Sequence, residues 1–193
     1  MTTSGLALPF RRTSVVAAAS AAFGAMLVLA LVGATHLAGG TSASHGGSGG
    51  ARVYTAPGHA FSIAVPAGWS ALGGDALARV PGSPAAVLRR SDGQGAVIVR
   101  RIPAIAGDLR TVARQLTVEL KRRVPGFRLV SARLGHVRAG GAFLYTFVRG
   151  NGAAQSLSVT TVRGATYRID SIVAAGLPDA ARQAGAAVGS FGP

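Results

Sequence analysis

The feature that most constrains this chain is an unbroken run of twenty uncharged residues, 15–34, near its N-terminus. As a helix rising about 1.5 Å per residue, the run would span roughly 30 Å, the thickness of the hydrocarbon core of a bilayer. Its large apolar side chains each favour insertion by about 0.3–0.6 kcal/mol. The run therefore predicts a single transmembrane helix within residues 13–38.

The flanking charges give this helix a direction. Arg11 and Arg12 precede the run, and no lysine or arginine follows it until Arg52. Because positive charge stays on the cytoplasmic side, residues 1–12 are expected to form a cytoplasmic tail. The alternative is a cleaved signal peptide, for which residues 32–34 offer a small-residue cleavage site. The length of the run favours the anchor, and both interpretations place the rest of the chain outside a bacterial cell membrane.

The composition changes sharply after this run. Residues 39–50, GGTSASHGGSGG, predict a flexible linker, because Gly/Ser-rich chains behave as random coils. Residues 51–193 are long enough for one domain with its own hydrophobic core. The chain has no cysteine, so disulfides, thiolate metal sites and a lipidated N-terminal cysteine are all excluded.

The domain begins with strand patterns. Phe61, Ile63 and Val65 alternate with smaller residues and predict a strand with one buried face, ended by a proline. Residues 86–102 then predict a hairpin, with a type I′ turn at the Asp-Gly pair 92–93.

An amphipathic helix is expected after this hairpin. Asp108 predicts its N-terminal cap, and Pro125-Gly126 predicts its end. Glu119 and Arg123 are spaced for an ion pair within the helix. The apolar stripe at helical spacing consists of Leu109, Val112, Leu116, Leu120 and Val124.

The second half of the domain repeats the strand pattern. Residues 127–139 predict a strand bent at Gly135, and residues 166–175 predict another. Residues 178–191 predict a closing, alanine-rich helix. Between these elements, the Asn-Gly pair 151–152 predicts a hairpin turn.

A turn centred on residues 151–152 fixes which side chains of this second hairpin face each other. Leu144 is then expected opposite Val159, and Thr146 opposite Leu157. The opposite face would bring together Phe143, Tyr145 and Phe147 with Thr160, Ser158 and Ser156. These six residues either lie beneath a helix, which small side chains allow to approach closely, or form the floor of a small pocket.

Both faces of this hairpin are apolar, so both need cover. The expected fold is therefore α+β, an antiparallel sheet flanked by helices. The order of elements resembles the PsbP-like superfamily, which includes extrinsic photosystem II subunits, a Ran-binding transport factor and small exported actinobacterial proteins. The resemblance covers residues 51–193 and implies an αβα sandwich with a binding or assembly role. The residues that carry it are Phe61, Ile63, Pro66, Gly68, Trp69, Ser190 and Phe191.

Charge indicates the class of partner. Residues 51–193 contain eighteen basic and six acidic residues, a net charge of +12, which attracts polyanions. The hairpin at 86–102 has Arg89-Arg90 on one arm and Arg100-Arg101 on the other, which predicts an anion-binding site unless the side chains diverge to opposite faces. Lys121, Arg122 and Arg123 form a second candidate, or else they stabilise the negative end of the helix dipole.

No pattern predicts catalysis, a metal site or a cofactor. His59 and His136 stand apart from clustered acids, and no phosphate-binding glycine motif follows a strand. We therefore expect a non-enzymatic binding or scaffold domain that contacts anionic lipid, wall polymer or an acidic protein, and not nucleic acid. A carrier of a small apolar ligand and an unrecognised hydrolase are the alternatives, and the oligomeric state stays open.

Overall fold

The computed structural model describes residues 52–104 and 109–193. The strands are β1 (Arg52–Thr55), β2 (Ser62–Val65), β3 (Trp69–Ala71), β4 (Ala86–Arg90), β5 (Gly95–Ile102), β6 (Arg128–Val137), β7 (Gly140–Val148), β8 (Ala154–Val162) and β9 (Ala165–Val173). The helices are the 3₁₀ helix η3 (Pro57–His59), α2 (Gly74–Ala78), α3 (Leu109–Arg123) and α4 (Pro178–Gly189).

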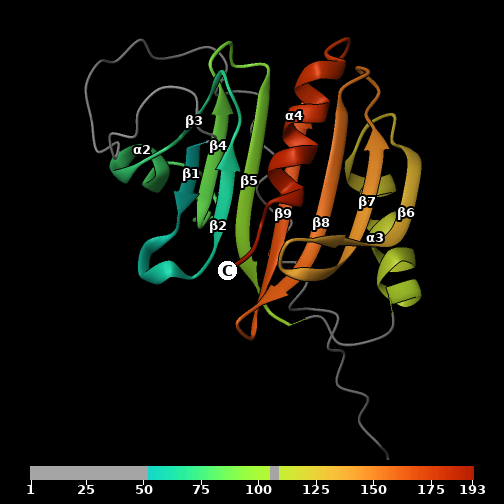
Figure 1. Ribbon diagram of the computed structural model, residues 1–193. Helices are drawn as coiled ribbons and strands as arrows, with labels where there is room; N and C mark the ends of the chain where they lie inside the picture. The colour runs from blue at the N-terminus through green and yellow to red at the C-terminus, as the bar shows by residue number, and fades with distance from the viewer. Residues whose placement is uncertain (1–51, 105–108) are drawn as a thin grey trace, which may run out of the picture.

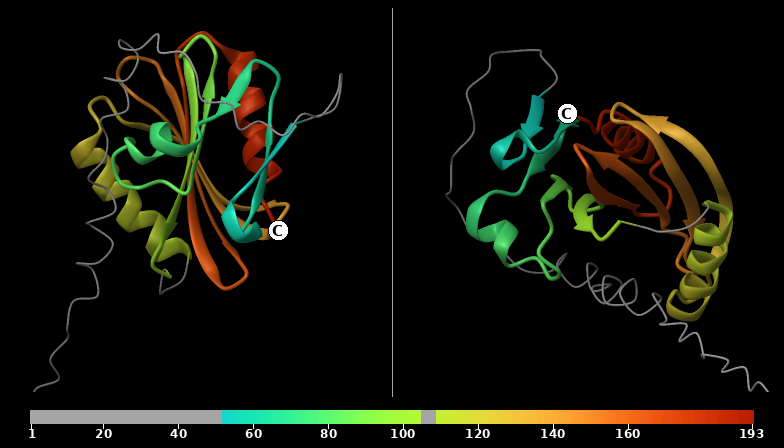
Figure 2. Two further views of the ribbon diagram at one scale, coloured as in Figure 1. Left: turned by 90° about the vertical axis from the view of Figure 1, so that its left-hand side faces the viewer. Right: turned by 90° about the horizontal axis from the view of Figure 1, so that it is seen from below.

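Seven strands form one antiparallel sheet in the order β3-β4-β5-β9-β8-β7-β6, and β1 pairs with β2 in a separate ribbon. Helix α4 and the β1–β2 ribbon cover one face of this sheet, and α3 covers the other (Figures 1 and 2). We call these the α4 face and the α3 face. The α+β class and the helices on both faces of the sheet are therefore as expected.

The α4 face carries the largest core cluster. Ala180, Ala184 and Ala187 of α4 are fully buried, so the helix backbone lies close to the sheet. The Trp69 indole N–H donates a hydrogen bond to Gln183 of this helix over 2.9 Å. Beyond the helix, the Phe191 ring packs 4.9 Å from that of Phe61 and 5.5 Å from that of Tyr167. The aromatic residues singled out in the sequence, Phe61, Trp69 and Phe191, thus join the C-terminal part of the chain to its first strands.

The α3 face has two smaller clusters. Leu116, Leu120 and Val124 pack on the aromatic row of β7, as the helical stripe predicts. The side chains of residues 109–113 lie outside the described part of the chain, as does the expected cap Asp108. The expected Glu119–Arg123 ion pair is present at 2.6 Å. Near β3, α2 adds a short piece of cover over β4 and β5 that the sequence patterns did not predict.

The first hairpin has the expected register but a different turn. Pairing of Leu88 with Val97 and of Arg89 with Ala96 is centred on the Asp-Gly pair. A type I′ turn needs positive φ at both central residues, and here only Gly93 has it, at 74°. Asp92 instead uses its carboxylate to accept a hydrogen bond from the Gln94 N–H over 2.9 Å. The type I′ assignment was therefore wrong.

The second hairpin is shifted by one residue from the expected register. Its loop closes with a hydrogen bond from the Arg149 N–H to the Ala153 C=O, so three residues lie between the arms, and Gly152 adopts a φ of 78°. Leu144 consequently pairs with Ser158, not with Val159. A one-residue shift exchanges the faces of one arm relative to the other.

The irregularity in β6 also differs from expectation. The pairing with β7 continues regularly through Gly135, and the bulge lies between Leu129 and Ser131. Gly135 instead lies close to a side chain of the neighbouring strand. A Cβ atom there would lie 2.5 Å from the Leu144 Cδ1 atom.

The expected cytoplasmic tail (1–12), transmembrane helix or signal peptide (13–38) and linker (39–50) all lie outside the described residues. Among the helices that the structure does describe, none combines the length and the apolar character needed to cross a membrane.

Candidate functional site: a buried arginine–aspartate cluster and a basic edge

The four arginines of the first hairpin do not come together. Arg89 pairs with Ala96, whereas Arg100 lies four residues farther along β5, opposite Arg168 of β9. Adjacent residues of a strand point to opposite faces, so each arginine pair is also divided between the two faces. The hairpin therefore does not bring its four guanidinium groups together. Arg101 is exposed.

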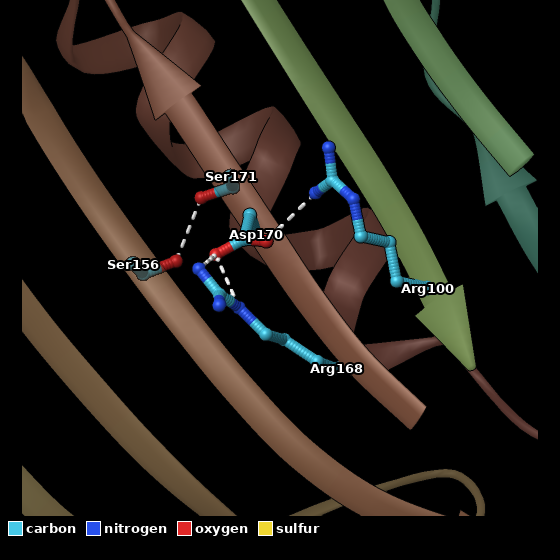
Figure 3. Close-up of polar contacts among 5 residues, drawn as sticks. All are labelled: Arg100, Ser156, Arg168, Asp170 and Ser171. Carbon is cyan, nitrogen blue, oxygen red and sulfur yellow. Dashed lines mark hydrogen bonds and ion pairs between the residues drawn. The ribbon is translucent and has the colours of Figure 1, made fainter. Parts of the chain in front are cut away.

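Two of these arginines have found carboxylates instead. Arg90 contacts Asp92 at 3.1 Å beside the turn. Arg100 belongs to a buried cluster on the α3 face, where its Nη1 atom donates to Asp170 Oδ2 over 3.1 Å. Arg168 donates to the other carboxylate oxygen of Asp170 from Nη2 at 2.7 Å and from Nε at 3.0 Å (Figure 3).

Strand register explains why this cluster forms. Arg100 and Arg168 are direct partners across β5 and β9, and like charges in that arrangement repel. Asp170 follows Arg168 by two residues, so its carboxylate lies on the same face and reaches both guanidinium groups. Only 2 % of Asp170 is exposed, and the two arginine side chains are 11 % and 12 % exposed.

Among the described residues, the guanidinium groups of Arg100 and Arg168 share the Asp170 carboxylate. Burial lowers the pKa of Arg100, whereas Asp170 opposes this effect and Arg168 adds to it. Within residues 52–104 and 109–193, the Arg100 Nη2 atom is buried without a hydrogen-bond partner. Because both oxygens of the Asp170 carboxylate are engaged, the arrangement suits electrostatic holding of the two central strands more than acid–base chemistry.

The shifted hairpin separates the six residues of the expected pocket. Phe143, Tyr145 and Phe147 lie on the α3 face, and α3 covers them. Ser156, Ser158 and Thr160 lie on the opposite face. There the Ser156 and Ser171 hydroxyls are 2.6 Å apart (Figure 3), and Thr160 donates to the Gly141 C=O over 3.0 Å. The six residues therefore do not line one pocket. The alternative interpretation, that a helix covers them, is confirmed for the three aromatic residues.

The second candidate, at the end of α3, is exposed. Lys121, Arg122 and Arg123 all lie at the surface, where they also complement the negative end of the helix dipole. A short turn joins them to β6, whose Arg128 and Arg133 are exposed as well, and Arg138 follows just beyond the strand. Helix α3 and β6 lie side by side at one edge of the domain (Figures 1 and 2). We call these six residues the basic edge.

The sequence analysis missed the β6 part of the basic edge, although a signal was available. Between Glu119 and Asp170 the chain contains nine basic residues and no acidic one. The β6 arginines are spread at five-residue intervals, so no run of adjacent charges drew attention to them. Their common location becomes visible only once β6 is known to be the last strand of the sheet.

The two histidines of the domain lie at its surface. His59 and His136 are both exposed. In the part of the chain that the structure describes, no three His, Asp or Glu residues gather as metal ligands would.

No protein-family model matches the chain, and no curated protein matches it significantly. Among solved structures, cyanobacterial PsbP (CyanoP) from Synechocystis sp. PCC 6803 matches with a TM-score of 0.53 and 21 % identity, over 79 % of this chain and 98 % of that one. The Ran-binding protein Mog1p from Saccharomyces cerevisiae matches with a TM-score of 0.50 and 13 % identity, over 74 % of this chain and 94 % of that one. At such identities the likeness concerns the fold.

Proposed function

Since the described domain has a PsbP-like fold, we propose that the protein is a membrane-anchored, non-enzymatic binding or scaffold domain that meets an anionic partner outside the cell membrane. The observation that carries this proposal is the basic edge, where Lys121, Arg122, Arg123, Arg128, Arg133 and Arg138 are all exposed along the end of α3, strand β6 and the turn after it. Mog1p, a Ran-binding protein, is an instance of this fold in a binding role.

The charge of the basic edge suits such a partner. Each basic residue close to an anionic surface contributes about 1 kcal/mol, and several act together. The attraction is screened beyond about 8 Å at physiological ionic strength, so added salt should weaken the contact. The basic edge requires only that its partner be negatively charged, and anionic lipid, wall polymer and an acidic protein all meet this requirement.

The location is testable because the chain has no cysteine of its own. In the full-length protein, a Ser91→Cys variant places one thiol on an exposed turn. A membrane-impermeant maleimide should label it in intact cells, whereas a Thr3→Cys variant should react only after lysis. Labelling of the Ser91→Cys variant only after lysis, or recovery of the chain in the cytosol, would contradict the proposed address.

The anionic contact is testable by crosslinking in cells. A photoreactive p-benzoylphenylalanine at Ala132, which is exposed on β6, reports what touches the basic edge. The same group at Ala181, exposed on α4, is the matched control. We expect adducts from position 132 that diminish when Arg128 and Arg133 are both changed to Glu. Adducts of equal yield from both positions, unaffected by these charges, would remove the basic edge as the binding surface.

A further inference from the structure

We propose that β6 accepts an extended acidic segment of another protein as an additional strand of the sheet. This inference rests on the proposed function and assigns a partner class to it. The added segment would alternate acidic and apolar residues, since β6 offers arginines on one face of the sheet and leucines on the other.

Strand β6 is the edge strand of the seven-stranded sheet. Strand β6 has ten residues, and its only strand partner among the described residues is β7. The backbone N–H and C=O groups that point away from β7 are therefore available to a further strand. The opposite edge, β3, has only three residues and offers much less. Peptide recognition by strand addition uses such an edge.

The side chains of β6 are unusual for an edge strand that only avoids pairing with other chains. Charged residues and bulges commonly prevent such pairing, and β6 has both. Yet Leu129, Val130 and Leu134 are 41 %, 56 % and 63 % exposed. Three of the five large exposed hydrophobic residues of the described chain thus lie on this one strand. An edge designed only to prevent pairing would not concentrate them there.

The register of β6 defines the pattern of its partner. Arg128 pairs with Val148 and Arg133 with Leu144, which places both arginines on the α4 face. Leu129 and Leu134 pair with Phe147 and Phe143, on the α3 face. Residues directly opposite each other across two strands share a face. A partner strand should therefore alternate acidic residues, on the α4 face, with apolar residues, on the α3 face.

This arrangement favours a protein strand over the other occupants. A bilayer surface meets one side of a molecule, whereas the arginines and leucines of β6 face opposite sides. A second copy of β6 would bring arginine strands together, and like charges across a pair are destabilising. Residues 1–51 of the chain contain no acidic residue, so they lack the complementary charge.

The test measures peptide binding to the full-length protein in detergent micelles by fluorescence anisotropy. The probe is a labelled ten-residue peptide of alternating glutamate and valine. One control has the same composition with glutamates and valines in separate blocks, and another is N-methylated at alternate backbone nitrogens. We expect both controls to bind about tenfold more weakly or worse, which corresponds to about 1.4 kcal/mol.

Charge exchange provides a positive result that misfolding cannot imitate. An Arg128→Glu/Arg133→Glu variant should lose the glutamate–valine peptide and bind a lysine–valine peptide instead. Arg79→Glu changes an exposed arginine beside α2 and should behave as the unchanged protein. Equal binding of alternating and block peptides, or of the N-methylated peptide, would overturn strand addition while leaving the proposed basic contact intact. Crosslinks from position 132 to lipid alone would likewise overturn the protein partner.

Discussion

At the scale of single residues, Asp170 stands out because its single negative charge faces two buried arginines. Its carboxylate lies on a central strand and accepts hydrogen bonds from both Arg100 and Arg168, which are cross-strand neighbours. Nothing in the local sequence predicts this cluster, because Arg100 and Asp170 are seventy residues apart and meet only through the register of β5 and β9. The sequence singled out Arg100 through its adjacency to Arg101 and so placed it in a candidate anion-binding site, whereas nothing in the sequence pointed to Arg168.

Removing the carboxylate should therefore be costly. An Asp170→Asn variant removes the carboxylate that the buried Arg100 and Arg168 guanidinium groups share. Loss of one partner from a buried ionic group costs about 3–5 kcal/mol, and we expect a loss of that size in the free energy of unfolding. Urea titration followed by the emission of Trp69, the single tryptophan, measures it. A loss below about 1 kcal/mol would mean that solvent already screens the cluster.

The opposite substitution distinguishes excess charge from simple ion pairing. An Arg100→Met variant leaves one arginine with one aspartate and removes the buried Nη2 atom that lacks a partner. Replacing a poorly compensated buried charge by an apolar side chain is often neutral or stabilising, so we expect a change within about 1 kcal/mol. If this variant loses as much stability as Asp170→Asn, a negative group other than Asp170 compensates the charge of the two arginines.

Tyr145 should make stability depend on alkaline pH. Burial raises the pKa of its hydroxyl, and the hydrogen bond with Thr117 opposes this effect to a lesser extent. The unfolded chain therefore loses this proton first, at about pH 10. The contribution to stability is complete below that pH and declines as pH rises through the folded-state pKa.

Urea midpoints compared at about pH 8 and about pH 11 test this dependence. A Tyr145→Phe variant should lose about 1 kcal/mol at the lower pH, through the missing Thr117 bond, and show a smaller decline at the higher pH. Burial also raises the pKa of Tyr54, so part of the decline should remain. An identical decline in both proteins would show that Tyr145 does not contribute.

At the scale of elements, the sequence predicted which segments pair but not always how they pair. The Asp-Gly hairpin has its expected register, because its loop, residues 91–94, is centred on that pair. The Asn-Gly hairpin is shifted by one residue, because its loop uses three residues, with Gly152 at positive φ. That single residue separated the expected pocket into two faces. Alternation reveals the buried face of a strand, whereas turn geometry decides which neighbour it meets.

Gly126, at the turn after α3, is a second place where backbone geometry decides an element's position. It adopts a φ of 63°, and a Cβ atom there would lie 2.4 Å from the Gly150 Cα atom. Gly126→Ala therefore adds a backbone clash to the usual cost of positive φ, and we expect a loss above about 2 kcal/mol. Gly176→Ala, at φ 77° with nothing within 4 Å, is the matched control and should lose about 1 kcal/mol. Equal losses would show that the α3–β6 turn tolerates displacement.

At the scale of the whole molecule, the C-terminus completes the fold. The residues after α4 return to β2, where the Ser62 N–H donates to the Gly192 C=O and the Ala64 N–H donates to the Ser190 hydroxyl over 2.8 Å. Phe191 is fully buried against Phe61. The short motifs at the two ends of the domain, which suggested the PsbP-like fold, are thus two halves of one contact.

Phe191→Ala should consequently loosen the β1–β2 ribbon as well as lower stability. Deleting a buried phenylalanine side chain costs about 3–5 kcal/mol, because the cavity is not refilled. We expect that loss in urea, together with faster hydrogen exchange at the Ser62 and Ala64 amides than at the amides of β8. Val118→Ala removes an exposed apolar side chain from α3 and should change stability by less than about 0.5 kcal/mol. If exchange accelerates equally in β2 and β8, the C-terminal contact stabilises the domain globally and does not hold the ribbon specifically.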